Sequence, residues 1–351
     1  MRNILITGGC GFIGSNFVGF WASKYPGDNI VVLDALTYAG NKSNIQHLIE
    51  HNKINFVHGD ICDLDLVNRL FSQFQIEKVV HFAAESHVDR SIAEPDAFIK
   101  TNIVGTHNLL IAAKEHWLGD NDVSEHHFHH ISTDEVYGSL APDGLPFKEI
   151  DQYKPNSPYA ASKASSDHLV RAYHETYGLQ TTISNCSNNY GAFHFPEKLI
   201  PLTIANILNN KAIPIYGDGK QIRDWLWVED HCRGIEQILL NGRHGEVYNI
   251  GGNNEWTNID IVKLICTKLN SQFSSNKTLT DKYPNALNAQ NNQSEQLISY
   301  VKDRLGHDRR YAIDASKIEN ELGFKPSISF EEGLTKTILW YLDNPSWWQE
   351  L

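Results

Sequence analysis

Two groups of residues in this sequence could act together on a hydroxyl-bearing substrate. Thr133, Asp134 and Glu135 follow an apolar run, while Tyr159 and Lys163 lie four residues apart in a stretch of helical period and so share one helix face. A tyrosine can remove a hydroxyl proton, and adjacent carboxyl groups can serve as acid and base when their surroundings push their pKa values apart. Beside a nicotinamide cofactor, these groups predict oxidation and elimination in one cleft.

The Tyr159 and Lys163 spacing is common, and its chemical meaning depends on the fold around it. A free phenol has a pKa of about 10, and bringing it near 7 requires about 4 kcal/mol of preference for the phenolate. One ammonium about 4 Å away supplies roughly that amount at an effective dielectric of about 20. We therefore expect Lys163, together with a positive nicotinamide ring, to lower the pKa of Tyr159 and make it the base.

A glycine-rich turn predicts where a dinucleotide binds. Gly8, Gly11 and Gly14 follow the first apolar run and open a helix, so that backbone N–H groups and the helix dipole can receive a pyrophosphate. Asp34 ends the second run, twenty residues beyond Gly14, where its carboxylate can accept hydrogen bonds from the adenosine ribose. That carboxylate would repel a 2′-phosphate, which favours NAD over NADP. Asp60-Ile61, after the third run, could flank the adenine or form a simple turn.

The elements that position these residues alternate in type. Short β-branched apolar runs alternate with longer segments of helical period, which indicates crossover connections and a parallel sheet covered on both faces. We predict an α/β fold: a doubly wound parallel (Rossmann-type) sheet with a smaller C-terminal substrate-binding lobe. The predicted strands are Asn3–Thr7, Ile30–Asp34, Asn55–His58, Lys78–Phe82, Phe128–Ser132 and Thr181–Asn185, and the predicted helices are Ser15–Lys24, Asp63–Phe74, Asp96–Trp117 and Pro158–Tyr177.

The regular alternation ends near residue 187, which predicts two domains. Residues 1–187 would form the NAD-binding domain, with about 222–250 able to return to it, and 188–351 would mainly form the second domain. Within the second domain, Ser271–Gln296 is rich in Ser, Asn, Gln, Lys and Thr. This composition is typical of a mobile surface loop.

Composition and charge exclude several classes of partner. The net charge of −12 over 351 residues lacks the broad basic field that nucleic acid or an acidic membrane surface requires. No long apolar run follows Met1, so we expect no signal peptide and no membrane span. Five scattered cysteines indicate free thiols in a reducing compartment, and we expect a cytoplasmic protein. The histidines of 126–130 alternate between strand faces without completing a ligand set, so we expect no metal site.

The motifs also resemble a known family. The run Thr7–Gly14 resembles the fingerprint of the extended short-chain dehydrogenase/reductase superfamily. Three longer runs, Ala83–Ser91, His130–Gly138 and Ser157–Arg171, are similar to those of the dTDP-glucose 4,6-dehydratases, a family of the deoxysugar and rhamnose pathway. This resemblance implies an NAD-dependent hydro-lyase that forms dTDP-4-keto-6-deoxyglucose from dTDP-glucose.

The resemblance implies a role for each catalytic residue. Tyr159 takes the C4 hydroxyl proton as hydride leaves C4 for NAD, and Thr133 holds the forming carbonyl oxygen. Glu135 then abstracts the C5 proton, while Asp134 protonates the departing C6 hydroxyl. Hydride returns to C6 while Glu135 gives a proton back to C5, so that NAD is regenerated and stays bound.

The resemblance also implies contacts and an assembly. It places the cofactor against Gly8, Gly11, Phe12, Ile13, Gly14, Asp34, Ala35, Leu36, Thr37, Asp60, Ile61, Phe82, Ala83, Ala84, Ser86, Thr101, Tyr159, Lys163 and Asn189. It places the nucleotide sugar against Ser86, Thr133, Asn188, Lys198, Leu199, Pro214, Ile215, Tyr216, Arg223, Asn258, Asp303, Arg304 and His307. Arg223, Lys198 and Arg310 would meet the diphosphate. The family further implies a homodimer through helices around 97–117 and 160–177.

Three alternatives differ in what they require of the catalytic residues. A nucleotide-sugar 4-epimerase would use Tyr159, Lys163 and Thr133 but would not need Asp134 and Glu135. A UDP-glucose 4,6-dehydratase would keep both acids and differ only in base recognition, which the sequence leaves open. A non-catalytic NAD-sensing protein is disfavoured because every catalytic residue type is present.

Overall fold

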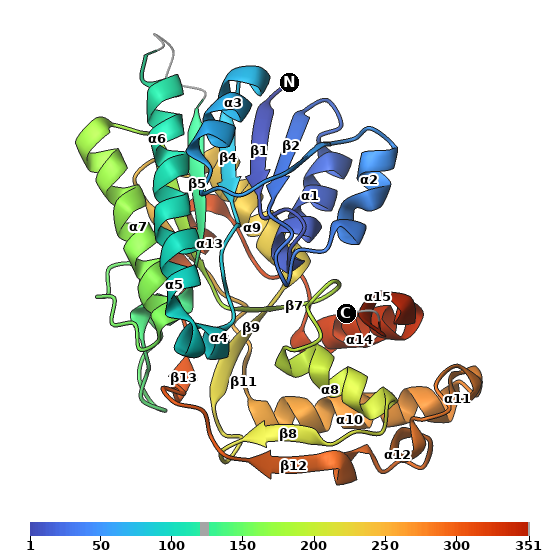
Figure 1. Cartoon of the computed structure of the whole chain (residues 1–351). Coiled ribbons are helices and arrows are strands. Elements are labelled where there is room, and N and C mark those ends of the chain that lie inside the picture. The colour runs from blue at the N-terminus through green and yellow to red at the C-terminus, as the bar shows by residue number, and fades with distance from the viewer. Residues whose placement is uncertain (120–125, 350–351) are drawn as a thin grey trace.

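The computed structural model describes residues 1–119 and 126–349, and within them a parallel sheet of seven strands forms the centre of the molecule (Figure 1). In spatial order the strands are β10 (Val247–Ile250), β6 (Thr181–Cys186), β5 (His127–Thr133), β4 (Lys78–His81), β1 (Asn3–Thr7), β2 (Asn29–Asp34) and β3 (Asn55–His58). The strand order reverses at β1. In doubly wound folds a ligand binds in the crevice at such a reversal, beyond the carboxyl ends of the strands.

Helices cover both faces of this sheet, and the strands are correspondingly apolar. Every residue of β5 and β6 is buried, as expected for central strands of a parallel sheet. The helices on one face are α1 (Phe12–Lys24), α9 (Val228–Asn241) and α13 (Ser316–Leu322); those on the other are α3 (Leu64–Phe74), α6 (Thr106–Trp117) and α7 (Pro158–Tyr177). Ser157 caps α7 by accepting a hydrogen bond from the Ala160 N–H at 3.1 Å, and Gly178 ends it at φ 73°.

The predicted fold class is confirmed, and all six predicted strands lie within one residue of the observed bounds. The seventh strand, β10, was not among them; it pairs with β6 and lies inside the predicted returning segment. The predicted helix Asp96–Trp117 is instead divided into α5 (Pro95–Phe98), a π-helical segment η2 (Ile99–Gly105) and α6. Within η2 the Asn102 side chain bonds the backbone of Glu85 at 2.8 and 3.0 Å, which ties this segment to the loop after β4.

Short helices complete the sheet-bearing part of the chain. They are η1 (Lys42–Ile45) and α2 (Gln46–Glu50) after β2, α4 (Val88–Ala93) after β4, and η3 (Asp134–Tyr137) directly after β5. The last of these carries the adjacent acids.

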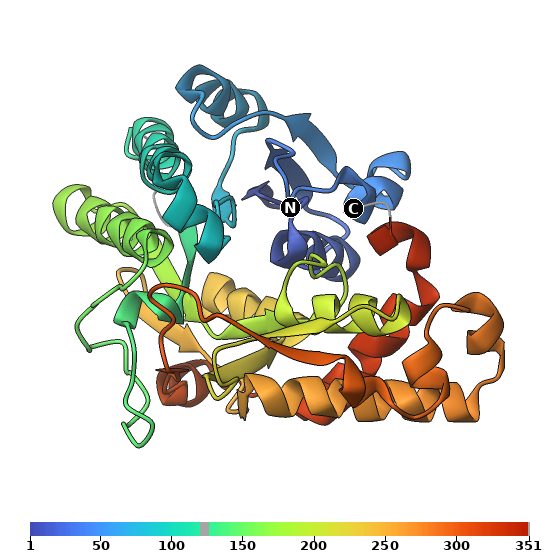
Figure 2. The same ribbon diagram turned by 60° about the horizontal axis from the view of Figure 1, so that its bottom comes forward.

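A smaller lobe lies against the carboxyl edge of the sheet, and in Figure 2 most of its yellow-to-red elements gather below the blue strands. Its strands are β7 (Asn188–Tyr190), β9 (Ile222–Trp227), β11 (Glu255–Thr257) and β13 (Arg310–Tyr311), with a separate parallel pair of β8 (Ile213–Tyr216) and β12 (Ile298–Val301). Its longer helices are α8 (Leu199–Leu208), α10 (Asn258–Ser275) and α14 (Phe330–Asp343), followed by α15 (Pro345–Gln349). These helices share one apolar core.

The expectation of a surface loop over Ser271–Gln296 is wrong. Helix α10 continues to Ser275 and is followed by α11 (Thr278–Lys282), α12 (Leu287–Gln290) and η4 (Ser294–Leu297). The few apolar residues of this polar segment fall where they can reach the core of the small lobe, and Leu279, Tyr283 and Ala289 are buried there.

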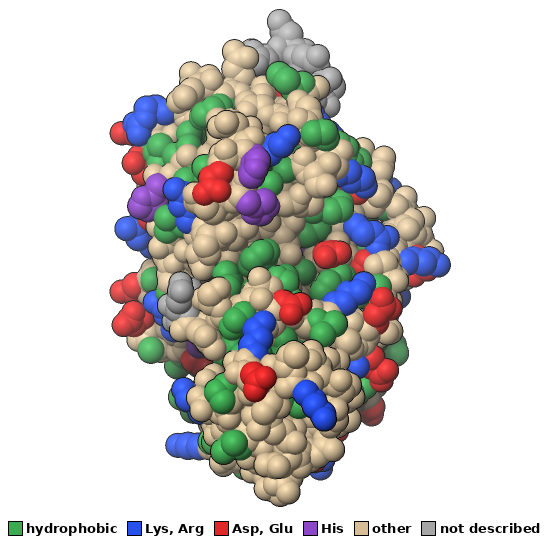
Figure 3. All heavy atoms as spheres, turned by 90° about the vertical axis from the view of Figure 1, so that its right-hand side faces the viewer, with side chains coloured by type: hydrophobic (Ala, Val, Ile, Leu, Met, Phe, Trp, Pro, Cys, Tyr) green, Lys and Arg blue, Asp and Glu red, His purple; other side chains and the backbone are tan. Residues whose placement is uncertain are grey.

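The surface and the cysteines offer three further observations. On the face shown in Figure 3, Lys and Arg side chains are interspersed with Asp and Glu. All five cysteines lie in the described part of the chain and are unpaired thiols. Among the residues described, no helix combines the length and apolar character needed to cross a bilayer.

We predict that Asp224 of β9 is a major contributor to stability. Its buried carboxylate accepts hydrogen bonds from the backbone N–H groups of Gly252 at 2.8 Å and Asn254 at 2.6 Å. Asp224→Ala leaves these buried donors unpaired, so the free energy of unfolding should fall by roughly 2 to 5 kcal/mol in urea denaturation. Glu175→Ala, which removes an exposed ion pair with Arg171, is the control and should change it by less than about 1 kcal/mol. Equal effects would contradict this role.

Candidate active site

A cavity of about 610 Å³ lies between the sheet edge and the small lobe. Both lobes contribute to its wall, and its size is typical of a site for a small organic ligand. Many of the residues that line it follow the carboxyl ends of β1 through β6.

The glycine turn forms one end of this cavity, and its geometry fits the pyrophosphate of a dinucleotide. Gly8 has φ +70°, and a Cβ added to it would lie 2.6 Å from the backbone nitrogen of Ala83. A Cβ on Gly14 would lie 2.2 Å from the carbonyl oxygen of Gly8. Helix α1 begins after Gly11 with no side-chain cap, so an anion can accept from the N–H groups of its first turn.

Asp34 organises the loop that completes the adenosine side. Its Oδ2 accepts from the Cys10 N–H and its Oδ1 from the Leu36 N–H, both at 2.8 Å. Asp34 also lines the cavity, so the remaining lone pairs of its carboxylate can accept from ribose hydroxyls. Burial raises the pKa of Asp34, and the two backbone bonds oppose that rise.

The adjacent acids sit in different electrostatic surroundings although they share one turn. Asp134 is 2% exposed. Burial first, and then the neighbouring carboxylates of Glu135 and Asp224, raise its pKa well above the usual range. Burial also raises the pKa of Glu135, but the cations Arg304, Arg223 and Lys198 oppose this. The neutral form is thus favoured more strongly at Asp134, and Glu135 is the more readily ionised of the two.

Tyr159 and Lys163 both line the cavity from α7, but the expected effect of one on the other is not observed. Burial first, and then Glu135, raise the pKa of Tyr159 well above its usual range, whereas a hydrogen bond with Thr133 lowers it. The Lys163 ammonium donates to the Ile131 carbonyl oxygen at 2.7 Å. Burial of the phenol thus outweighs any effect of Lys163 on its pKa here, and the expected joint effect of Lys163 and a nicotinamide ring stays a prediction.

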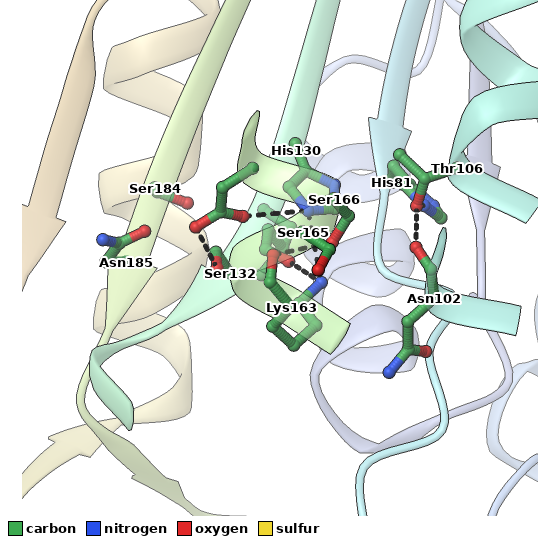
Figure 4. A network of polar contacts seen from close by, with 12 residues as sticks. His81, Asn102, Thr106, His130, Ser132, Lys163, Ser165, Ser166, Ser184 and Asn185 are labelled. Atoms are coloured by element: carbon green, nitrogen blue, oxygen red, sulfur yellow. Dashed lines mark hydrogen bonds and ion pairs between the residues drawn. The ribbon is translucent and has the colours of Figure 1, made fainter. Parts of the chain in front are cut away.

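A buried polar network surrounds Lys163, as Figure 4 shows for its labelled members. His130 Nε2 lies 3.3 Å from the Lys163 nitrogen and 3.3 Å from Asp167 Oδ1, and Ser132 donates to Asp167 Oδ2 at 2.8 Å. Burial lowers the pKa of Lys163 to about 8, and the Asp167 carboxylate opposes that change. Asp167 therefore helps to keep the buried Lys163 ammonium charged beside the cavity.

Cations gather at the small-lobe end of the cavity in spite of the acidic composition of the chain. Lys198, Arg223 and Arg304 line it, and Arg223 lies over the Tyr311 ring at 4.2 Å. His307 also lines it and contacts Asp303 at 2.6 Å. This end suits a diphosphate.

The cavity brings together most of the predicted site residues. Those lining it are Gly8, Gly11, Phe12, Ile13, Gly14, Asp34, Ala35, Thr37, Asp60, Ile61, Phe82, Ala83, Ala84, Ser86, Thr101, Thr133, Asp134, Glu135, Tyr159, Lys163, Asn188, Asn189, Lys198, Leu199, Pro214, Tyr216, Arg223, Asn258, Arg304 and His307.

Four other predicted contacts lie outside the cavity lining. Leu36 and Ile215 pack against apolar cores, and Asp303 contacts His307. Arg310 pairs with Glu255 at 2.5 and 2.7 Å, so its guanidinium is held away from the diphosphate end.

Sequence reasoning missed several lining residues. Tyr38 and His87 follow the ends of β2 and β4, and this position at the sheet edge was the available signal. Glu197 and Tyr311 belong to the small lobe, where no strand pattern pointed to them. Within residues 1–119 and 126–349, no group of three or more His, Cys, Asp or Glu side chains could hold a metal ion.

Comparison with known proteins agrees with this geometry. The model of the GDP-mannose 4,6 dehydratase family matches residues 5–337. A dTDP-glucose 4,6-dehydratase of Salmonella typhimurium (strain LT2) is 53% identical, over 98% of this chain and 94% of the relative. The chain belongs to the dTDP-glucose 4,6-dehydratase family.

Solved structures of this family extend the match to three dimensions. The dTDP-glucose 4,6-dehydratase of Bacillus anthracis str. Ames in complex with NAD is 42% identical with a TM-score of 0.86, covering 100% of this chain and 99% of that one. The enzyme of Streptomyces venezuelae, solved with NAD and a second ligand, is 45% identical with the same TM-score of 0.86 and the same coverage, 100% and 99%. The family uses NAD, which fits the glycine turn described above.

We predict that Asp167 sets the pH range in which Lys163 is charged. Asp167→Asn removes the negative charge that raises the pKa of Lys163, so this pKa should fall below about 8. The ammonium would then be lost at lower pH, and the alkaline limb of the pH profile of turnover should shift downward. Ser165→Ala, on the same helix with its hydroxyl bonded to the Ala161 carbonyl oxygen, is the control and should keep the wild-type profile. An unshifted alkaline limb in Asp167→Asn would contradict this role.

Proposed function

We propose that this protein is an NAD-dependent hydro-lyase that converts dTDP-glucose into dTDP-4-keto-6-deoxyglucose. The observation that carries the proposal is the pair Asp134 and Glu135, placed beside Tyr159 in one cavity, with burial raising the pKa of both and nearby cations limiting the rise at Glu135. Membership of the dehydratase family supports it.

Each catalytic side chain has a part that its surroundings support. Tyr159 is proposed to take the C4 hydroxyl proton, with Thr133, its hydrogen-bond partner, holding the carbonyl oxygen that forms. Glu135, among three cations, is proposed to remove the C5 proton, which the new C4 ketone acidifies. Asp134, whose pKa is raised by burial and by the neighbouring carboxylates, is proposed to donate a proton to the departing C6 hydroxyl.

The cofactor half of the cavity supplies the rest of the reaction. NAD, when bound, would supply the hydride acceptor for C4 and the hydride donor for C6, and its oxidised ring would add positive charge near Tyr159. The chain holds it through the glycine turn and Asp34, and Lys163 stands beside the phenol on the same helix face. Lys198, Arg223 and Arg304 are proposed to hold the diphosphate.

The alternatives fit less well. A 4-epimerase would leave the opposed surroundings of Asp134 and Glu135 without a purpose. A UDP-glucose 4,6-dehydratase would use the same acids and is separated only by experiment. A non-catalytic NAD sensor would need none of the acid and base groups gathered here.

The roles of the two domains and the assembly of the protein are also proposals. Residues 1–187, joined by α9 and β10, are proposed to hold NAD, and 188–351 mainly the nucleotide sugar. Exposed apolar side chains at Ile99, Val104 and Tyr177 support a homodimer through the α5–α6 region and α7. A monomeric mass in sedimentation at micromolar concentration would contradict the dimer.

The five free thiols support a reducing compartment such as the cytoplasm.

We predict that Glu135→Gln stops the reaction after oxidation at C4. An amide cannot take the C5 proton, so product formation should fall at least about 100-fold while absorbance at 340 nm accumulates in a single turnover. NAD binding should be unchanged. Glu175→Gln, on the exposed end of α7, is the control and should react normally. Product formation at the wild-type rate in Glu135→Gln would refute the base assignment.

The substrate class is tested by mass spectrometry of the purified protein incubated separately with dTDP-glucose and UDP-glucose, without added NAD. We expect loss of one water from the dTDP sugar. Conversion to the galactose isomer with unchanged mass would indicate an epimerase, and loss of water from the UDP sugar alone would indicate the other dehydratase.

A further inference from the structure

Helix α15 reaches across from the small lobe to the cofactor side of the molecule. Trp347 Nε1 donates to Asn44 Oδ1 at 2.7 Å, although the two residues are 303 positions apart in sequence. Figure 2 shows the red end of the chain lying beside the blue helix that follows β2. The next indole differs, because Trp348 Nε1 donates to the Tyr341 carbonyl oxygen within the small lobe at 3.0 Å.

Asn44 connects Trp347 to the glycine turn. It is 3% exposed, and its Nδ2 donates to the carbonyl oxygen of Cys10 at 3.0 Å. The Asn41 N–H donates to the same oxygen, also at 3.0 Å. Cys10 in turn donates its N–H to Asp34. Three hydrogen bonds, linked through the Asn44 side chain and the Cys10 backbone, therefore connect Trp347 to the Asp34 carboxylate that lines the cavity.

The Trp347 ring supports a second loop of the same pocket. It packs against Phe193 with ring centroids 5.8 Å apart, and Trp340 packs against both rings at 5.0 Å. Phe193 has φ +65°, a left-handed conformation that a bulky residue adopts only when its neighbours hold it there.

The residues that flank Phe193 contact the first turns of α1. The Ala192 carbonyl oxygen accepts from Asn16 Nδ2 at 2.9 Å, and the His194 ring stacks on Phe12 at 4.4 Å. Phe12 lines the cofactor end of the cavity. Trp347 thus supports the glycine turn from two directions, through Asn44 and through Phe193.

We propose that Trp347 is a positioning residue that keeps the adenosine side of the pocket closed and so slows the release of NAD. The proposal rests on the NAD-dependent function above. That reaction regenerates NAD in every turnover, so the cofactor has no need to leave. Ala35 and residues 37–40 of the loop after β2 line the cavity, and Asn44, just beyond this loop, holds it to the Cys10 carbonyl oxygen. We expect this loop to open less readily while the Trp347 bond to Asn44 is intact.

Trp347→Phe is the sharpest test because it removes the donor and keeps most of the ring packing. Loss of one hydrogen bond predicts roughly three- to tenfold faster NAD release, measured by chasing bound labelled NAD with excess unlabelled NAD. Trp348→Phe is the matched control: it loses an indole N–H from the same helix and should release NAD at the wild-type rate. Adding Trp347→Phe to Asn44→Ala should give no further acceleration, since both act through one contact.

A second measurement separates this role from a structural one. Because coupling between two sites is reciprocal, NAD should slow hydrogen exchange of the α15 amides in the wild type and do so less in Trp347→Phe. Wild-type release from Trp347→Phe, or equal acceleration in Trp348→Phe, would overturn the proposal. Failure of the wild type to bind NAD would instead overturn the function on which it rests.

Discussion

The parallel sheet imposes one constraint on which the whole site depends: its strands all end at the same edge. The glycine turn follows β1, Asp34 ends β2, and Thr133 ends β5. Residues far apart in sequence therefore meet in one cavity because their strands run in the same direction. The small lobe then closes over this edge and brings Lys198 and Arg223, which supply the positive charge that the strand ends lack.

Burial then decides how the chemical groups behave. Removing carboxyl, phenol and ammonium groups from water disfavours their charged forms, and the pKa values of Asp134, Tyr159 and Lys163 all shift in the direction that burial dictates. Neighbours set the differences among them. Nearby cations lower the pKa of Glu135 relative to that of Asp134. The Asp167 carboxylate raises the pKa of Lys163 and so helps it to retain its charge. The site is therefore tuned as much by residues behind it as by residues facing the cavity.

The sequence was sufficient to predict those parts of the fold and of the site that a local pattern determines. Strands such as Asn55–His58 were located because apolar period and strand ends are local features, and the glycine turn because its spacing is dictated by backbone geometry. The sequence was insufficient to predict features that depend on contacts between residues far apart in the chain. The helices over 278–290 depend on a few side chains, such as Tyr283, that reach a core formed elsewhere. The pKa of Tyr159 and the pairing of Arg310 with Glu255 likewise depend on neighbours that only the fold brings near.

Strand β10 comes much later in the sequence than its partner β6, and this affects how the chain folds during synthesis. During synthesis β6 emerges about sixty residues before β10. Until then β6 is an open edge with unpaired backbone groups, and the part of the sheet face that α13 covers stays uncovered for longer still. The nascent first half therefore exposes a strand edge that the finished protein covers with β10. Chaperone engagement during translation should be concentrated in this interval.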